Sequence, residues 1–424
     1  MKVYSTQRRV VITGLGAIAP NGIGKESFWH ATQRGISGIS CAPAAGTVDS
    51  AVPALPAGYV TNFSGEQYIE RKLLKRTDRM TQLAFAALQE ALADAHLTED
   101  VLDPQRTGLV IANTMGGVGY VLKQLQALYT RGPRAISAYT AIAWLNVATV
   151  GQAAIQYGIQ GYCKTPVNDS ASGLEALGMA YRALRRGSAD IILAGGCEAF
   201  LYPLVLRVMA SQGICVQGSD PNAYRPFDRR AGGLLMAEGA GICILEDYEH
   251  AHKRGATIYG EIVGFAQTND AHGLQMPSAD GTYYARAICQ TIEQANIQTE
   301  EIAYFSLDGR AVPSSDLGEA QALRLAFGTD LAQIPVSVPR TSIGHSYAAA
   351  GALDTITALQ ALAAGLIPPT TNCEELDPRY PLQMVRETAQ ALPASTHARQ
   401  VVLLGARSIG GSNLVLALQK GETA

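Results

Sequence analysis

The stretch Asn168–Gly173, which reads Asn-Asp-Ser-Ala-Ser-Gly, decides how the rest of this sequence is interpreted. After it, apolar residues recur at helical spacing from Leu174 to Leu184, and Gly187 is a typical helix stop signal. Ser170 is therefore expected in a turn that leads into a helix. A reactive side chain there gains from the helix N-terminus, whose free N–H groups and positive dipole end stabilise a nearby anion. The function of the chain depends on whether Ser170 is such a nucleophile.

The surroundings of Ser170 have a second, similar copy near His345. Ser170 precedes an Ala-rich helix and an expected strand over Asp190–Gly195. His345 precedes an Ala-rich helix over Ala348–Leu362 and a later strand over Val401–Gly405. Two similar halves that meet face to face would bring the starts of both helices to one central site.

Short apolar runs alternate with helical patterns along the chain, which indicates the α/β class. The first examples are a strand over Arg9–Thr13, a helix over Met80–Ala95 and a strand over Gly108–Ala112. The charged stretch Glu246–Gly255 is the expected junction, so the two halves are placed at residues 1–250 and 251–424. His250 and His252 in this stretch are expected on a solvated turn rather than in a metal site.

The composition favours a subunit of an assembly over a nucleic-acid-binding protein. Charged residues make up 16% of the chain, well below the ~25% of an average soluble protein. A large permanent subunit interface would explain this low value. The net charge is -3 and the 33 Lys and Arg residues are scattered, so there is no electrostatic reason to expect nucleic acid as a partner.

The cysteines and the apolar stretches indicate a cytoplasmic protein without a membrane span. Seven cysteines are widely spaced and form no Cys-x-x-Cys pair, which suits a reducing compartment. Met1–Val11 carries no secretory apolar region. The longest weakly charged stretch, Tyr347–Ile367, has Asp354 as its only charge and is rich in Ala and Gly. It is expected to form a helix packed inside the protein rather than one that faces lipid.

Several segments form a recognisable series along the chain. They are Val10–Gly22, the Ser170 turn, Tyr224–Asp228, Glu238–Gly241, Gly344-His345 and Gly410–Asn413. In this order the chain resembles the β-ketoacyl synthases of fatty-acid and polyketide assembly, from about Arg9 to Leu418. The resemblance implies the thiolase-like α/β fold, in which two repeated halves form a five-layered α/β/α/β/α core, and an obligate dimer.

An active synthase of that family carries a Cys nucleophile and two histidines. The resemblance places the Cys position at Ser170 and the first His position at Asp308, and it retains the second His as His345. Arg340 replaces the Lys five residues earlier, and Ile409 replaces the aromatic gate. A serine hydroxyl, unlike a partly ionised thiol, needs an adjacent base, and a carboxylate at 308 would repel the developing enolate. Claisen condensation is therefore not expected at this site.

One subgroup shows this kind of change: the chain-length factor, or ketosynthase β, of type II polyketide synthases. The chain resembles it at Asp308–Pro313, Asp316–Glu319, Gly132-Pro133, Ser137–Tyr139, Ala143-Trp144 and Val338–Thr341. Ser170 and His345 are departures, because the subgroup commonly has Gln at the first position and often lacks the second His. The resemblance implies a non-catalytic subunit in an obligate heterodimer with an active ketosynthase. It also implies no metal and no bound cofactor, since the phosphopantetheine arm arrives on an acyl carrier protein.

The resemblance also locates a tunnel and an interface loop. Val118, Val121 and Leu125 follow Gly116-Gly117 and share one helix face, a stripe that in isolation would simply be core. In chain-length factors, residues at these positions gate the polyketide tunnel at the subunit interface. The loop with Ser137, Ala138, Tyr139 and Thr140 is expected to reach the active site of the partner.

Alternatives remain for two features. Ser170, Asp308 and His345 could serve a free-standing enzyme of synthase-like fold, either a malonyl-carrier decarboxylase or a serine acyltransferase. The Gly-x-Ser-x-Gly elbow of α/β-hydrolases is absent, because Asn168 and Ser172 flank the serine. The basic run Arg71–Arg76, with Arg79 nearby, could dock an acidic carrier protein or simply be a solvated helix face.

Overall fold

The computed structural model of this chain describes residues 8–41, 56–98, 101–394 and 399–421, and its strands form two similar halves of one mixed sheet. In the first half the order is β1 (Val10–Ala19), β8 (Gly239–Asp247), β7 (Ile191–Glu198), β5 (Thr107–Ala112) and β6 (Cys163–Lys164). In the second half it is β9 (Gly260–Asn269), β16 (Ser412–Lys420), β15 (Val401–Arg407), β10 (Ile302–Ser306) and β11 (Pro335–Ser337), with β13 (Gln383–Met384) beyond. Each half has two antiparallel pairings followed by two parallel ones. The repeat predicted from the sequence is therefore confirmed.

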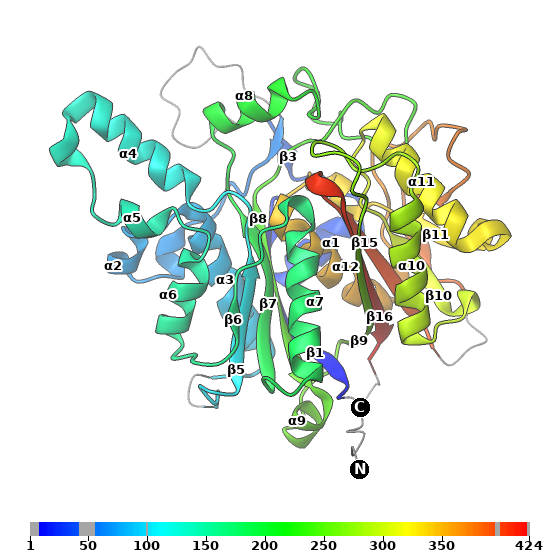
Figure 1. Cartoon of the computed structure of the whole chain (residues 1–424), viewed down its shortest axis with the longest axis horizontal. Helices are drawn as coiled ribbons and strands as arrows, with labels where there is room; N and C mark the ends of the chain where they lie inside the picture. Colours follow the sequence, from blue (N-terminus) through cyan, green and yellow to red (C-terminus); the bar gives the residue numbers. More distant parts are fainter. Residues whose placement is uncertain (1–7, 42–55, 99–100, 395–398, 422–424) are drawn as a thin grey trace.

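Helices form three layers around these two half-sheets (Figure 1). The outer layers contain α3 (Arg79–Asp94), α10 (Thr282–Ala295) and α11 (Pro313–Phe327). The middle layer contains α7 (Ser172–Arg185) and α12 (Ala350–Ala364), which share one apolar core with strands of both halves. On the first half α3 covers the outer face, and on the second half α10 and α11 do so. This is the five-layered arrangement that the resemblance implied.

The two central helices approach closely at their starts because glycines stand at the contact. A Cβ added to Gly173 would lie 2.3 Å from the carbonyl oxygen of Ala348, and one added to Gly351 would lie 2.5 Å from the amide of Leu174. Real side chains do not tolerate such distances, so glycine at both positions lets the backbones meet. This contact fixes where Ser170 and His345 lie relative to each other.

The predicted junction between residues 250 and 251 falls inside α9 (Tyr248–Lys253). The stretch was expected to be a solvated turn, but it forms a short helix because the Asp247 side chain accepts the amide of His250 at 3.2 Å and caps it. His250 contacts Glu246 through Nδ1 at 2.5 Å. Among the residues that the structure describes, no group of three or more His, Cys, Asp and Glu side chains could hold a metal ion.

The remaining helices flank this core: the first of them packs against β1 and α12, and the others lie toward its edges (Figure 1). They are α1 (Lys25–Thr32), α2 (Arg71–Leu74), α4 (Val118–Arg131), α5 (Thr140–Ala143), α6 (Ala148–Gln156) and α8 (Pro203–Ser211). Figure 1 shows α4 projecting from the body on the side of β5 and β6. None of the helices in the described part of the chain is both long and apolar enough to cross a membrane.

Candidate functional site

Both central helices begin in a strained turn, and the two turns contact each other. Asp169 has φ 48° immediately before Ser170, and Tyr347 has φ 45° two residues after His345. Few residues other than glycine adopt this left-handed conformation, which is common at functional turns. The 3-10 turns over Asp169–Ala171 and Tyr347–Ala349 touch at the centre of the molecule. The structure thus brings the starts of both repeats to one place.

Ser170 is buried, with 1% of its surface exposed, and its hydroxyl is fully engaged. Its Oγ donates to the backbone carbonyl of Arg407 at 2.7 Å and lies 3.0 Å from Asp169 Oδ2. It also accepts a hydrogen bond from Nη2 of Arg310. A hydroxyl has one proton, and here two acceptors, the Arg407 carbonyl oxygen and the Asp169 carboxylate, compete for it. His345 is not among its hydrogen-bond partners, so the Ser-Asp-His order does not form a catalytic relay.

Asp308 is a buried carboxylate between two arginines. Its Oδ1 lies 3.2 Å from Arg340 Nη1, and its Oδ2 lies 3.2 Å from Arg310 Nε. Burial alone would raise the pKa of Asp308, but contact with His345 and the charges of Arg310 and Arg340 overcome it and lower the pKa. A negative charge therefore occupies the centre of this buried cluster, at the position that was predicted from the sequence to correspond to the first His of an active synthase.

His345 is held as a neutral ring by its buried surroundings. Its Nδ1 accepts the amide of Tyr347 at 3.1 Å. Its Nε2 lies 2.9 Å from Arg340 Nη1 and 3.8 Å from Asp308 Oδ1. Burial, together with the two arginines, outweighs the Asp308 carboxylate and lowers the pKa of His345 to about 4. The retained histidine therefore participates in the ion network.

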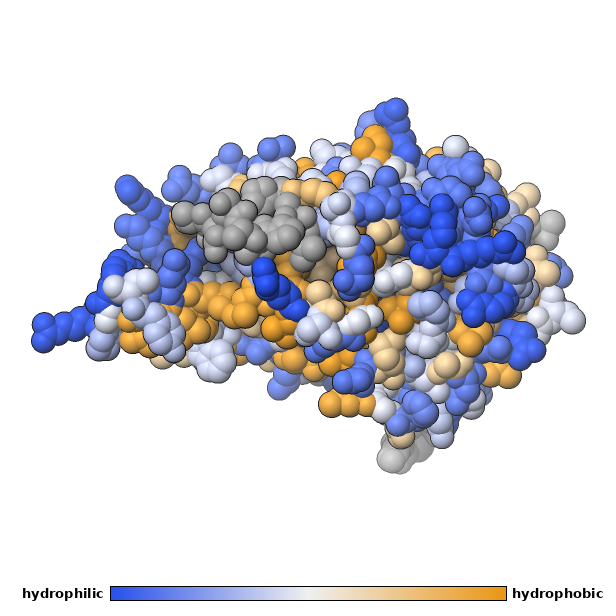
Figure 2. Space-filling model, turned by 90° about the horizontal axis from the view of Figure 1, so that it is seen from above, coloured by the Kyte–Doolittle hydropathy of each residue, from blue (hydrophilic) through white to orange (hydrophobic). Residues whose placement is uncertain are grey.

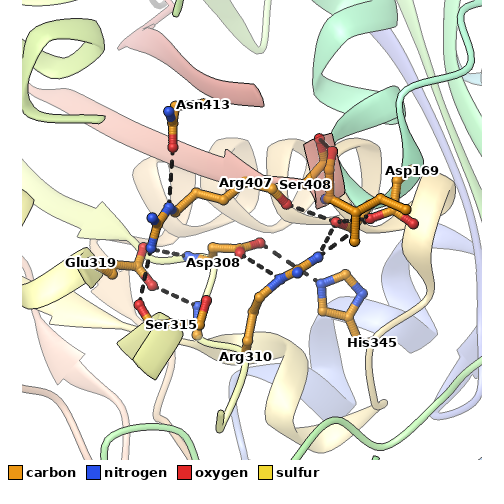
Figure 3. A network of polar contacts seen from close by, with 12 residues as sticks. Asp169, Asp308, Arg310, Ser315, Glu319, His345, Arg407, Ser408 and Asn413 are labelled. Carbon is orange, nitrogen blue, oxygen red and sulfur yellow. Dashed lines mark hydrogen bonds and ion pairs between the residues drawn. The ribbon is translucent and has the colours of Figure 1, made fainter. Parts of the chain in front are cut away.

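The network extends into α12 through Asp354, which binds Arg340. This pair explains the single charge in an otherwise apolar stretch. Figure 3 shows Arg310 reaching from its loop toward Asp169 while it also contacts Asp308. We refer to Ser170, Asp308, Arg310, Arg340 and His345 as the Ser170 pocket. Arg310 was not predicted as a site residue from the sequence, although it is the only cation in the segment 307–313, which also contains Asp308.

Arg407 forms the floor of the pocket. It is fully buried, and its guanidinium donates to Asn413 Oδ1 at 3.1 Å and to the carbonyls of Ser315 at 3.0 Å and Ser278 at 2.7 Å (Figure 3). These bonds fix the backbone carbonyl that accepts the Ser170 proton. Ile409 follows at the rim, 41% exposed, and its amide donates to Asp169 Oδ2 at 3.3 Å.

The predicted gate residues lie on α4, and the first of them, Val118, packs against the apolar cluster that contains Phe200 and Val205. Val118 and Val121 are half-buried, and Leu125 is 41% exposed. The adjacent loop is fastened to the same helix, because the amide of Ser137 donates to Gln124 Oε1 at 2.9 Å. Leu125, and part of Val121, are therefore available to a neighbouring surface.

The loop also borders the basic run. Arg71, Lys72, Lys75 and Arg76 line a surface hollow of about 820 Å³ together with Ser137 and Tyr139. Arg76 lies over the ring of Tyr139 at 4.3 Å. Arg79 does not belong to this basic surface, because it turns inward to pair with Glu238 at 2.7 Å.

These features agree with the comparison with known proteins. Residues 7–251 match the β-ketoacyl synthase N-terminal domain, and residues 259–374 match the β-ketoacyl synthase C-terminal domain. The chain belongs to the β-ketoacyl synthase family. Within it, the chain resembles the ketosynthase β subunits, or chain-length factors, of type II polyketide synthases.

The similar proteins include both polyketide and fatty-acid types. The tetracenomycin polyketide synthase ketoacyl synthase beta subunit of Streptomyces glaucescens is 36% identical over 97% of this chain and 98% of its own length. The 3-oxoacyl-[acyl-carrier-protein] synthase 2 of a Synechocystis strain is 33% identical, with 98% of each chain covered. Among solved structures, the ishigamide ketosynthase/chain length factor has a TM-score of 0.90 at 29% identity, over 98% of this chain and 100% of that one.

Proposed function

We propose that this chain is the non-catalytic subunit of a heterodimeric type II polyketide synthase and that it shapes the tunnel limiting chain growth. The observation that carries the proposal is the Ser170 pocket. Arg310 fills the space beside the Ser170 hydroxyl, and ionised Asp308 places a negative charge where condensation requires neutral hydrogen-bond donors. The similarity to ketosynthase β subunits supports the same assignment.

The chemistry of the pocket argues against condensation. The reaction needs a nucleophile that loses its proton and neutral donors that stabilise an enolate oxygen. The Ser170 hydroxyl is held by the Arg407 carbonyl, the Asp169 carboxylate and the Arg310 guanidinium, and ionised Asp308 has no proton to donate. His345 directs Nε2 at Asp308 and Arg340. Each of the three positions is therefore committed to the ion network.

A broad apolar surface supports an obligate partner. Exposed apolar side chains occur on α4, α5, α6 and α8 and in the segments between them: Tyr129, Ile142, Trp144, Leu145, Val147, Ile155, Val167, Leu204 and Val208. Figure 2 shows a band of apolar residues on the upper face that runs toward the end from which α4 projects. The edge strand β6 lies on the same side of the first half-sheet and pairs only with β5 among the described strands. Exposed edges and large apolar patches are typical of subunit contacts.

The partner would be an active ketosynthase, and the shared tunnel would pass the stripe of Val118, Val121 and Leu125. One similar structure, at 29% identity and a TM-score of 0.87, is a type II PKS acyl-carrier protein in complex with its ketosynthase bound to the hexaketide. By analogy, the substrate would reach this complex on the phosphopantetheine arm of a carrier protein. The basic hollow of Arg71, Lys72, Lys75 and Arg76 has a charge that suits an acidic carrier.

The second candidate is a free-standing decarboxylase or serine acyltransferase, which the retained Ser170 and His345 favour. The lack of a hydrogen bond between them, and the guanidinium of Arg310 on Ser170 Oγ, weigh against it. A single experiment separates the two proposals. The chain is incubated with acyl-loaded and malonyl-loaded carrier protein, and the intact mass of the chain and the carbon dioxide released are measured.

Under the proposed function the chain gains no acyl mass and releases no carbon dioxide by itself. An acyl adduct that disappears in Ser170→Ala would establish the acyltransferase instead. Co-expression with a synthase that has intact Cys, His and His supplies the second readout. The pair should copurify and make polyketide, whereas the chain expressed alone should aggregate or form poor homodimers because its apolar face is uncovered.

A further inference from the structure

The side chain of Arg310 fills the space beside the Ser170 hydroxyl. Only 2% of Arg310 is exposed, and its Nη2 donates to Ser170 Oγ and lies 3.6 Å from Asp169 Oδ2. Its Nε lies 3.2 Å from Asp308 Oδ2. The guanidinium therefore spans from the turn before α7 to the loop after β10, across the position where the two halves meet.

A substrate carbonyl has no room to approach Ser170 while Arg310 is in place. A nucleophile reacts with a carbonyl carbon placed about 3–3.5 Å away. Around Ser170 Oγ that shell holds Arg310 Nη2, the Arg407 carbonyl at 2.7 Å and Asp169 Oδ2 at 3.0 Å. The obstruction does not depend on whether residue 170 is a good nucleophile.

The space that Arg310 fills lies close to the surface. The side chain of Asp169 is 11% exposed, and Ile409, whose amide binds it, is 41% exposed. Removal of the guanidinium would leave a void lined by Ser170, Asp169 and Asp308, next to these partly exposed groups. A polar void of this kind admits water and small polar molecules.

We propose that Arg310 is an internal plug that keeps an acyl thioester away from residue 170, whichever nucleophile stands there. The inference rests on the proposed non-catalytic function and adds to it the residue that closes the site. Ion pairs with Asp169 and Asp308 hold the plug, because a swing outward would leave both carboxylates without this cation. The planar, always charged guanidinium suits such a bridge between two carboxylates.

The test uses Ser170→Cys in the full-length chain, copurified with its synthase partner, as a reporter of access. Iodoacetamide is the probe: the Cys sulfur displaces iodide from the probe's CH₂ carbon to form a thioether, and the thiol proton goes to buffer. Trypsin releases the peptide 165–182, which contains no native cysteine, so its mass reports residue 170 alone. Exposed Cys289 is the internal control for reagent activity.

Two charge-matched variants separate volume from charge. Both carry Ser170→Cys and Asp308→Asn; one adds Arg310→Met, which keeps a long side chain, and the other adds Arg310→Ala, which opens the space. We expect residue 170 to react at least ~10-fold faster in the Ala variant than in the Met variant or in Ser170→Cys alone, since cysteine reactivity follows exposure. Cys289 should react equally in all three.

Rapid labelling of Ser170→Cys with Arg310 intact would overturn the plug, whether or not the Ala variant folds. So would an unlabelled Ala variant whose thermal unfolding matches that of the Met variant. Neither result would contradict the proposed non-catalytic function, which is tested separately by acylation of the wild-type chain. Labelling confined to the Ala variant, with buried Cys243 unlabelled to show that the fold is intact, supports the proposal.

Discussion

Arg340 Nη1 lies 3.2 Å from the Oδ1 atom of Asp308, and both side chains are buried beside the starts of the two central helices. Arg340 also binds Asp354 and contacts His345, so one guanidinium ties three elements of the second half together. Asp308, Arg340, His345 and Asp354 thus form a buried ion network.

The first prediction concerns the stability of this network. Asp308→Asn removes the negative charge that two buried arginines share, and removing one member of a buried ion pair typically costs about 3–5 kcal/mol. The free energy of unfolding, measured in urea, should fall by about that amount. Asp330→Asn is the control: this exposed carboxylate should change it by less than about 0.5 kcal/mol. Equal effects of the two variants would mean that the network contributes no special stability.

The second prediction concerns the pH dependence that His345 creates. Its folded-state pKa of about 4 lies below the unfolded value of about 6.5, so between these values the unfolded chain binds one more proton. This histidine therefore makes the free energy of unfolding fall by about 3 kcal/mol as the pH is lowered from 7 to 4. His345→Gln should lose this component.

The measurement for His345 is the difference between wild type and His345→Gln at each pH. Buried Glu198 and Asp316, whose pKa values burial raises to about 8, act in the opposite direction but are present in both proteins. Their contributions cancel in the difference. The free energy of unfolding of wild type minus that of His345→Gln should therefore decrease as the pH is lowered toward 4. A constant gap would show that His345 is not kept neutral by the fold.

Much of the fold could be predicted because its signals are local. The Ala-rich stretch with only Asp354 charged predicts a buried helix, and α12 occupies it. The predicted helix over Met80–Ala95 is α3, shifted by one residue at each end. Periodicity and composition are properties of neighbouring residues, so a single sequence contains them.

The partners of buried charges could not be predicted in the same way. Arg310 meets Ser170 across 140 positions of sequence, and Arg79 meets Glu238 across 159. Whether a cation is buried depends on which carboxylates the fold brings to it, and no local pattern reveals that. The resemblance located Ser170, Asp308 and His345, but only the structure shows that they are joined through arginines.

The third prediction concerns the partner surface. Trp144 is 51% exposed beside the loop with Ser137 and Tyr139, and large aromatic side chains dominate the binding energy of interfaces. Trp144→Lys should raise the Kd for the synthase partner roughly 30-fold, which corresponds to about 2 kcal/mol of binding free energy, and should reduce copurification accordingly. Leu325→Lys is the matched control, because Leu325 is 54% exposed on α11, in the outer layer of the second half. A heterodimer that survives Trp144→Lys but not Leu325→Lys would place the interface on α11 instead.

The last prediction is that Val118, at the start of α4, limits the length of the product. Val118 is half-buried and small, so a tunnel that passes it should continue and admit a longer chain than a Phe would allow. Val118→Phe overfills that passage at a cost of about 1–3 kcal/mol. This cost lowers the rate of extension relative to the rate of release by ~5- to 150-fold at the step where the growing chain reaches the ring. The reconstituted complex should release shorter polyketides while the first condensations keep their rate, as product mass spectra over time would show. Gln126→Phe adds the same ring at an exposed position of the same helix and should leave the product unchanged. If Val118→Phe forms the heterodimer and makes the original product, the growing chain does not pass this face of α4.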